Sequence, residues 1–374
     1  MEPDFADRLR DRAREIGFDG LGVAAVAGDG PGAEKYRDWI ARGYHGTMTW
    51  MEREGGRCDP AALLPGARSV VVAITNYFHP DPPTASSARG VVSRYARGNG
   101  DYHGLVQKRL DALASWIRSR IGGDTKACVD TSAILERDWA IRAGLGGRGK
   151  HTLLLTREFS SWVFLGEILT TAEILPDAPY EKDPCGTCAK CIDICPTRAI
   201  VAPYVLDARR CIAYLTIENR GPIPREMREA MGNLVFGCDL CQEVCPWNRF
   251  AKESKEASFL PRKDLRAPLL SDLADRAGRT EAEFAAAFAG SPVRRARREG
   301  FLRNVAVALG NSQDAEAEAP LGRLLEDSSA LVRAHAAWGL GRIGSETARA
   351  RLAERRWWED DAAVLEEINL AIGS

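Results

Sequence analysis

The sequence predicts three successive units: an α/β domain, a cysteine-rich α+β domain and a C-terminal array of α-helical repeats. Three observations predict this order. Strand and helix patterns alternate up to about residue 175, eight of the ten cysteines lie between Cys185 and Cys245, and two similar helical stretches recur near the C-terminus. We therefore expect domains at 1–175, 176–250 and 291–374, with a helical connector over 251–290.

The first domain is predicted from its apolar patterning. Phe5, Leu9 and Ile16 share one face of an amphipathic helix. The run of β-branched residues at 68–76 is typical of a buried strand, and 161–170 indicates another. The other expected elements are a strand at 21–24, a helix at 104–120, a strand ending at 128–129 and a helix at 134–144.

Composition and charge exclude several classes of protein. The 374 residues are 45% apolar and 28% charged, which is ordinary for a soluble folded chain. The net charge of −1 argues against a uniformly basic nucleic-acid binder, although it does not describe local patches. Because no long apolar run and no signal-peptide pattern occur, we expect a cytoplasmic protein without membrane contact. In that compartment clustered cysteines indicate metal binding instead of disulfides.

The cysteine spacing predicts two iron–sulfur clusters. Cys185, Cys188, Cys191 and Cys195 precede a proline in the C-x2-C-x2-C-x3-C-P pattern of bacterial two-cluster ferredoxins. In that pattern three thiolates bind one cluster and the fourth binds the other, and a second run with the same ending follows in this chain. Crosswise pairing gives one site from Cys185, Cys188, Cys191 and Cys245, and another from Cys195, Cys211, Cys238 and Cys241.

Zinc is the alternative ligand for these thiolates. Zinc ribbons, however, use two C-x2-C knuckles instead of a three-cysteine wrap that ends in Cys-Pro. We therefore expect two [4Fe–4S] clusters and a one-electron relay. Cys58 and Cys128 are expected to be small buried residues.

The C-terminal region carries a repeat and a basic segment. Leu309-Gly310 and Leu340-Gly341 end two similar apolar stretches about 30 residues apart, which favours HEAT-like repeats over an ordinary pair of helical hairpins. Residues 291–303 contain five arginines and one glutamate. Such a segment suits a phosphate backbone, but composition alone equally allows a solvated helix face.

Two motif-like stretches in the first domain are not accepted as sites. The segment 144–151 resembles a phosphate-binding loop, but His151 stands where Ser or Thr is required. Asp101-Tyr102-His103 resembles the start of a cobalt-ligating motif, but Val106 replaces the required glycine, so we expect a solvated loop histidine. Asp130 follows a strand, and burial would make it a general acid. On the residues alone, a role as helix N-cap is favoured.

Beyond these patterns, nearly the whole chain resembles the epoxyqueuosine reductases, which complete queuosine modification of tRNA. The matching blocks are GYHGTMTWM (43–51), SRYARGNGDYH (93–103), VDTSAILERDWAIRAGLGGRGKHTLL (129–154), EFSSWVFLGEI (158–168) and RCIAYLTIENRGPIPREMREAMGNLVFGCDLCQEVCPWN (210–248). The resemblance implies a nitroreductase-like first domain that binds cobalamin. It also implies an oxidoreductase that reduces epoxyqueuosine at the tRNA wobble position, with electrons passing through two [4Fe–4S] clusters to cobalamin.

The resemblance extends to individual residues. It implies that Asp130 donates a proton, which requires a raised pKa. It also implies tRNA contacts at Arg137, Arg294, Arg295 and Arg303, and cobalamin contacts at Arg57, Ser93, Asp130, Leu154 and Leu165.

The implied partners are a tRNA anticodon stem-loop and an external low-potential electron donor, and we expect a monomer. The rival interpretations are a corrinoid enzyme similar to reductive dehalogenases, a tRNA-binding electron carrier and a zinc-containing tRNA scaffold.

Overall fold

A four-stranded sheet forms the centre of the first domain. Its order is β1-β2-β7-β4. These strands are β1 (Gly20–Ala25), β2 (Ser69–Asn76), β7 (Val163–Thr170) and β4 (Thr125–Cys128). The computed structural model describes residues 4–27, 32–53, 55–80 and 86–373. Within that part, the strands predicted at 21–24, 68–76, 128–129 and 161–170 are confirmed to within a few residues.

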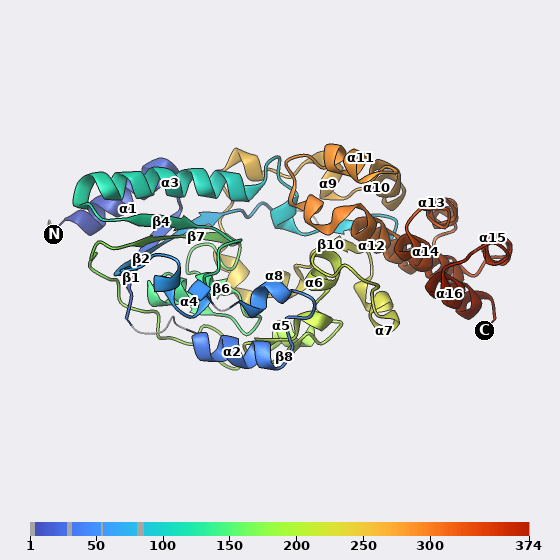
Figure 1. Ribbon diagram of the computed structural model, residues 1–374, viewed down its shortest axis with the longest axis horizontal. Helices are drawn as coiled ribbons and strands as arrows, with labels where there is room; N and C mark the ends of the chain where they lie inside the picture. The colour runs from blue at the N-terminus through green and yellow to red at the C-terminus, as the bar shows by residue number, and fades with distance from the viewer. Residues whose placement is uncertain (1–3, 28–31, 54, 81–85, 374) are drawn as a thin grey trace.

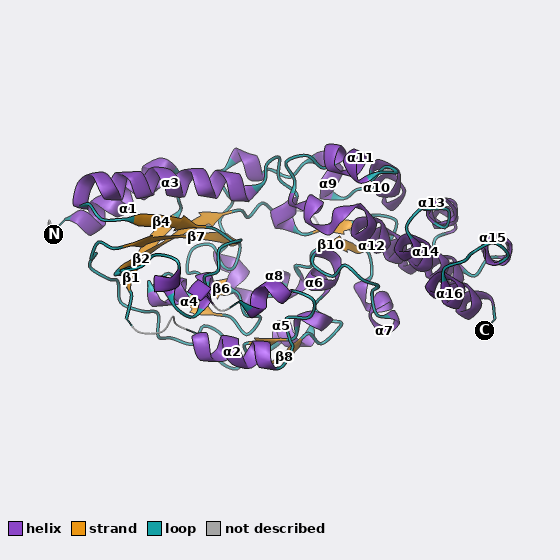
Figure 2. Ribbon diagram, viewed as in Figure 1, coloured by secondary structure: helices purple, strands orange, loops and turns teal. Residues whose placement is uncertain are grey.

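Helices cover both faces of this sheet (Figures 1 and 2). α1 (Phe5–Ile16) and α3 (Tyr102–Ile121) pack on one face and share a core with the alternate side chains of β2 and β7. α4 (Glu136–Arg142) packs on the other face, where Trp139 is fully buried. α3 approaches β7 closely because Gly166 has no Cβ, which would lie 2.8 Å from Leu110. The predicted helices therefore form and enclose the sheet.

The strands of this sheet are antiparallel, although a chain of alternating strands and helices typically forms a parallel sheet. All three pairings in the sheet are antiparallel, whereas strand–helix–strand units usually form parallel sheets. The reason is the place of β7. β2 and β4 run in the same direction and are joined through α3, but β7 lies between them and pairs antiparallel with both.

Smaller elements complete the first domain. They are α2 (Ala33–Ala41), the two-residue strand β3 (Val91–Val92) and the hairpin of β5 (Gly147–Arg148) and β6 (Leu154–Leu155).

The cysteine-rich domain consists of short elements between the first domain and the repeats. It contains α5 (Lys190–Asp193), β8 (Ile200–Ala202), β9 (Val205–Leu206), α6 (Ile212–Ile217), α7 (Arg225–Arg228), β10 (Leu234–Phe236) and α8 (Leu240–Glu243). β10 pairs in parallel with β3 of the first domain. The two domains are therefore joined by a shared two-stranded sheet as well as by the chain itself.

The C-terminal third is helical, as predicted. The expected connector contains α9 (Lys263–Arg266), α10 (Leu270–Arg276) and α11 (Glu281–Ala287), and the repeats contain α12 (Arg297–Ser312), α13 (Glu318–Leu324), α14 (Ala330–Ile343), α15 (Glu346–Arg356) and α16 (Ala362–Ile372). Phe284 and Phe288 pack against Phe301 of α12. The connector therefore shares a continuous core with the repeats. None of the described helices has the length and apolar character needed to cross a bilayer.

The recurring Leu-Gly pair has a packing explanation. A Cβ on Gly310 would lie 2.6 Å from Gly339 Cα, so α12 and α14 cross with their backbones nearly touching. A Cβ on Gly341 would lie 2.6 Å from Ala371 Cβ, where α14 meets α16. The repeated glycines therefore let successive repeats approach one another.

Candidate active site

Asp130 lies immediately after β4, in a strained turn. Its φ is 35°, a left-handed conformation that non-glycine residues seldom adopt. Its backbone N–H donates to Glu136 Oε1 at 2.8 Å, and its side chain is 51% exposed. The N-cap role favoured by the residues is wrong: α4 begins at Glu136, with Leu135 in the cap position. The Asp130 carboxylate is thus free to contact other groups.

His103 connects Asp130 to a second carboxylate. Its Nε2 lies 2.9 Å from Asp130 Oδ2, and its Nδ1 lies 2.5 Å from Asp101 Oδ1. Asp101 also caps α3 by accepting from the His103 backbone N–H. His103 is therefore not the solvated loop histidine expected from the sequence. It bridges two carboxylates, an arrangement that favours the imidazolium.

The proton at this site resides on His103. Partial burial disfavours a charged imidazole, but the hydrogen bonds to Asp101 and Asp130 outweigh this and raise the pKa of His103 to about 9. Burial would raise the pKa of Asp130, but the hydrogen bond and charge of His103 outweigh it and lower that pKa. The expected rise at Asp130 is therefore wrong, because a cation lies next to the carboxylate. The Asp130–His103 pair carries the acidic proton jointly.

Aromatic rings hold His103 in place. Tyr102 stacks on Phe164 with ring centroids 4.0 Å apart and planes 4° from parallel. The ring of His103 stacks on the other side of this pair, 4.0 Å from the Tyr102 centroid. Tyr95 meets Tyr102 edge to face. This stack restricts the imidazole to the plane in which it reaches both carboxylates.

Two further acidic groups lie behind the Asp130 turn. Burial and the charge of Asp130 raise the pKa of Glu136 to about 7. Glu167 is fully buried in β7, and among the described residues neither of its carboxylate oxygens has a hydrogen-bond partner. Burial and the neighbouring charge of Glu136 raise the pKa of Glu167 well above its ordinary value. The environment of Glu167 therefore favours its neutral form.

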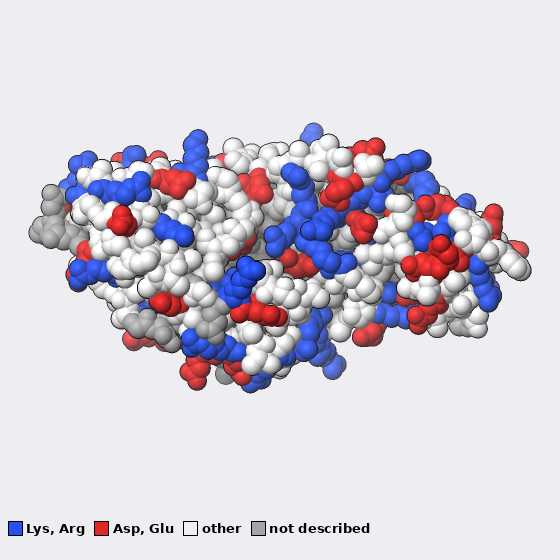
Figure 3. Space-filling view, viewed as in Figure 1, with Lys and Arg blue, Asp and Glu red and all other residues white. Residues whose placement is uncertain are grey.

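Three of the four arginines predicted to contact tRNA lie at the surface. Arg294 and Arg295 are exposed in the turn before α12, and the positive charge of Arg295 contributes to the lowered pKa of Asp130. Glu218 orients Arg295 through two hydrogen bonds of 3.0 and 3.1 Å. Arg137 is exposed and donates to Thr152 O at 3.0 Å. Lys and Arg side chains gather near the middle of the face seen in Figure 3.

Arg303, the fourth, cannot contact tRNA. Its side chain is fully buried and donates to the carbonyls of Leu215, Asn219 and Gly221. Burial lowers the pKa of Arg303 to about 9. Its role is structural, because it joins α12 to the loop that follows α6. The basic sequence pattern could not separate it from its exposed neighbours.

We expect Arg303→Met to lower the free energy of unfolding by about 3 kcal/mol, because three buried carbonyls lose a charged donor. Arg294→Met, at an exposed position, should change it by less than about 0.5 kcal/mol. Urea denaturation of the two cluster-loaded variants measures the difference. Equal stability of the two variants would contradict the structural role of Arg303.

The residues predicted to contact cobalamin lie in several elements of the first domain. Ser93 is buried beside Asp239. The Asp239 carboxylate accepts hydrogen bonds from the Ser93 hydroxyl and from the Arg94 N–H. Leu154 and Leu165 are buried together on the α4 side of the sheet. Arg57 is buried, donates to Arg53 O at 2.8 Å and lies over the Trp50 ring.

One buried donor suits a large ligand with amide groups, such as cobalamin. Burial and the charge of Arg137 lower the pKa of His151 to about 4, so this imidazole is neutral. Its Nδ1 accepts from the Leu153 N–H at 3.2 Å, which places the proton on Nε2. That buried Nε2 has no partner among the described residues. A corrin amide carbonyl would satisfy it, so the residues present fit the implied cofactor.

The eight clustered cysteines form no disulfides and fall into two neighbourhoods. Burial and the neighbouring thiolates of Cys185 and Cys245 raise the pKa of Cys191 to about 11. Burial and the thiolates of Cys211 and Cys195, together with Asp239, raise that of Cys238 to about 12. These are the neighbours that crosswise pairing requires, and α5 packs against α8 so that the two cysteine runs meet.

Each thiolate of such a cluster binds a different iron, so the four need not converge as single-ion ligands do. Within the described residues, no three His, Cys, Asp or Glu side chains form a single-ion site. Cys58 and Cys128 are buried in the first domain, as expected.

The glycine-rich segment before β6 donates hydrogen bonds to the loop that carries Cys185 and Cys188. The Lys150 backbone N–H donates to Cys185 Sγ at 3.3 Å. Its ammonium donates to the carbonyls of Gly186 and Cys188 at 2.6 and 2.9 Å. The segment that resembles a phosphate-binding loop thus positions cysteines, a role that its sequence did not reveal.

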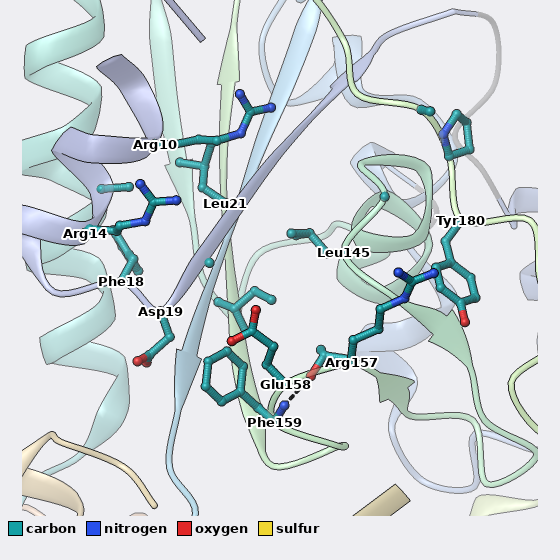
Figure 4. A pocket seen from close by; sticks show the side chains of 17 residues that line it. Arg10, Arg14, Phe18, Asp19, Leu21, Leu145, Arg157, Glu158, Phe159 and Tyr180 are labelled. Carbon is teal, nitrogen blue, oxygen red and sulfur yellow. Dashed lines mark hydrogen bonds between the residues drawn. The ribbon is translucent and has the colours of Figure 1, made fainter. Parts of the chain in front are cut away.

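A separate cavity lies away from these residues. It has a volume of about 490 Å³ and borders the outer edge of β1 (Figure 4). Arg10 and Arg14 reach it from α1, and Arg157 and Tyr180 reach it from the opposite side. None of the predicted site residues lines it. We therefore locate the active site by its chemistry and not by cavity size.

Comparison with known proteins gives the family. Three family models match: epoxyqueuosine reductase QueG over residues 57–131, a 4Fe-4S double cluster binding domain over 184–248, and HEAT repeats over 294–373. The predicted two-cluster domain and the predicted repeats are thus confirmed.

Curated relatives and solved structures match over nearly the whole chain. An epoxyqueuosine reductase from Xanthomonas campestris is 45% identical and covers 91% of this chain and 97% of its own length. The Escherichia coli enzyme is 41% identical over 90% of this chain and 89% of its own. A crystal structure of epoxyqueuosine reductase with an epoxyqueuosine-modified tRNA-Tyr stem loop superposes with a TM-score of 0.90 at 31% identity, covering 99% of this chain and 98% of that one.

A structure of the Bacillus subtilis enzyme matches with a TM-score of 0.88 at 30% identity, covering 99% of this chain and 98% of that chain. In it, a catalytic loop that carries an aspartate has swung out of the active site. The relatives, the family model and the superposed structures are all epoxyqueuosine reductases. They favour this family over the electron carrier and the zinc-containing scaffold considered from the sequence. This chain belongs to the epoxyqueuosine reductase family.

Proposed function

We propose that this protein reduces epoxyqueuosine in tRNA to queuosine. The reaction consumes two electrons and two protons, opens the epoxide, forms the alkene and releases water. The observation that carries the proposal is an Asp130–His103 acid pair, flanked by exposed arginines, in a chain of this family that also supplies eight cluster-type cysteines. The test is to incubate the reconstituted protein with cobalamin, a low-potential reductant and epoxyqueuosine-tRNA. Mass spectrometry of the nucleoside should show the loss of one oxygen atom, and an unchanged nucleoside would contradict the function.

The cofactors of this family are cobalamin and two [4Fe–4S] clusters. We assign the clusters to the two crosswise sets of cysteines defined above. Cobalamin, when bound, supplies a strongly reducing metal centre for the epoxide. Arg57, Ser93, Leu154 and Leu165 would hold it, and His151 Nε2 would donate to one of its amides. A nitroreductase-like first domain is supported by the antiparallel sheet between α3 and α4.

The acid pair supplies the first proton. We infer that the proton passes from His103 Nε2 to Asp130 across their 2.9 Å contact. Asp130, which lies nearer to bulk solvent than His103, transfers it to the epoxide oxygen as the ring opens, which leaves His103 neutral. Asp101 stabilises the imidazolium from the other side. A carboxylate next to an imidazolium thus acts as an acid without a raised pKa of its own.

The strained Asp130 turn is suited to movement. Glu136 holds it through the Asp130 N–H. With its pKa raised to about 7, Glu136 gains a proton near neutral pH and then accepts a weaker hydrogen bond. The displaced catalytic loop of the Bacillus subtilis enzyme supports such a motion. We propose that this loop closes on the substrate.

The tRNA side of the site is assigned to Arg137, Arg294 and Arg295. All three are exposed. Arginine pairs well with phosphate through its forked donors. The relative bound to a tRNA stem loop supports this assignment. Because its substrate is a tRNA, we propose that the enzyme acts in the cytoplasm, as a monomer with an external electron donor.

We expect the single-turnover rate to fall as pH rises through about 9, because His103 then loses the proton that the reaction needs. His103→Gln should be slower at neutral pH and should lack this decline. Rapid-quench measurements from pH 7 to 10, with the cofactors reduced beforehand, test this. A wild-type rate that stays constant over that range would exclude His103 as the proton source.

A further inference from the structure

A surface groove opens beside one of the cluster cysteines. Its volume is about 440 Å³, and it is lined by Ile192, Asp193, Cys195, Arg198, Ile200, Val201 and Arg210. Cys195 is half-buried here, and under the crosswise pairing it binds the second cluster. An electron that enters through this groove would therefore meet a cluster ligand directly.

Exposed apolar side chains lie in the segments that line the groove and directly next to its lining residues in the chain. Ile194 is 43% exposed and Val201 is 41% exposed. Pro196, Ala202 and Pro203 are exposed as well. Single exposed apolar residues are common on proteins, but a group of them around a redox ligand is typical of an interaction site.

The rim of the groove is basic. Arg198 is exposed and follows Cys195 in a turn, with a φ of 51° and its N–H donating to Cys195 O. Arg210 donates to Thr197 O at 3.0 Å, which fixes it at the edge of the groove. Asp193 is the acidic residue of the lining, so the two arginines leave a net positive charge. The groove is thus complementary to an acidic partner.

The position of the groove separates it from the substrate side. α5 and β8, which flank it, lie at the lower edge of the molecule in Figure 1, whereas α3 runs along the upper edge and α12 lies at mid-height toward the C-terminal end. Lys and Arg side chains also gather at this lower edge in Figure 3. A carrier protein in the groove would therefore leave the Arg294–Arg295 side free for tRNA.

We propose that this groove is the docking surface for an acidic, low-potential electron carrier of the flavodoxin or ferredoxin class. The proposal rests on the cluster assignment made under the proposed function. In each encounter the reduced carrier loses one electron and the cluster ligated by Cys195 gains it, so two encounters supply one turnover. Redox encounters use small, transient interfaces and depend on electrostatic steering. A few exposed apolar side chains within a basic rim meet both requirements.

The test is anaerobic stopped-flow reduction of the cluster-loaded protein by flavodoxin hydroquinone. The double variant Arg198→Glu with Val201→Glu should lower the second-order rate constant of cluster bleaching by about tenfold or more at low salt. The effect should shrink as ionic strength rises. Dithionite, which needs no docking surface, should reduce this variant within about twofold of the wild-type rate. That measurement also shows that the variant is folded and loaded.

A matched control changes an exposed arginine and an exposed apolar residue far from the clusters, as in Arg356→Glu with Leu370→Glu. This control should react with flavodoxin at the wild-type rate. The proposal is overturned if the groove variant also reacts at the wild-type rate. It is likewise overturned if Lys182→Glu with Lys190→Glu, near the other cluster loop, slows the reaction instead. Because the assay contains no tRNA, failure of the proposed enzymatic function would not affect its outcome.

Discussion

Asp130→Asn should slow turnover by about 10²-fold or more while both clusters and the bound cofactor remain in place. An asparagine cannot pass a proton from His103 to the epoxide oxygen, and loss of a positioned acid typically costs about 10²–10⁴-fold in rate. The amide also removes the negative charge that raises the pKa of His103, so the imidazole in this variant should lose its proton at a lower pH. Single-turnover deoxygenation of epoxyqueuosine-tRNA measures the loss. Iron, sulfide and cobalamin content measure what remains.

The control for this variant is Asp111→Asn. Asp111 is an exposed carboxylate on α3 that accepts from Gln107 and lies outside the acid pair. It should retain the wild-type rate. If Asp130→Asn deoxygenated the substrate at a rate near that of this control, the assignment of Asp130 as proton donor would be wrong.

Pairs of cysteine substitutions should separate the two clusters. A cubane that loses two of its four thiolates cannot be retained. Under the crosswise pairing, Cys185→Ser with Cys245→Ser removes ligands of one cluster, so about half of the iron and sulfide should remain. Cys185→Ser with Cys195→Ser removes one ligand from each cluster, so both clusters should become labile and the cluster absorbance should fall much further. Turnover should be lost in both variants because the relay is broken.

The two buried cysteines outside the cluster sites, Cys58 and Cys128, provide the control for these variants. Cys58→Ala with Cys128→Ala should retain all of the iron, because both residues lie in the first domain away from the clusters. If the Cys185–Cys245 pair lost both clusters while the Cys185–Cys195 pair lost one, the first four cysteines would bind a single cluster. The crosswise pairing would then be wrong.

The elements that the sequence predicted correctly are those encoded by local spacing. Apolar periodicity identified the four central strands and the long α3 helix. The cysteine spacing identified a two-cluster domain, since it specifies which thiolates a short loop can present together. The repeated Leu-Gly pairs identified the HEAT-like array because glycine is needed wherever α12, α14 and α16 cross closely. In each case the physical cause lies within a few residues of the pattern.

The chemistry of the candidate site depends on contacts between distant segments. Asp130 was recognised, but its lowered pKa comes from His103, which is 27 residues earlier in the chain. The basic segment predicts an RNA contact at Arg303 because nothing local distinguishes it from Arg294. It is buried by carbonyls more than 80 residues away. The antiparallel course of the sheet depends on where β7 inserts.

The sequence by itself therefore determined the two-cluster domain, the helical repeats and the family, and it predicts the ligands of each cluster. Only the tertiary structure decided which group holds the proton and which arginines face the solvent, and only it revealed the groove beside Cys195. The physical reason is that spacing along the chain is a local property. Burial, pKa and surface charge depend on every segment that folds against a residue.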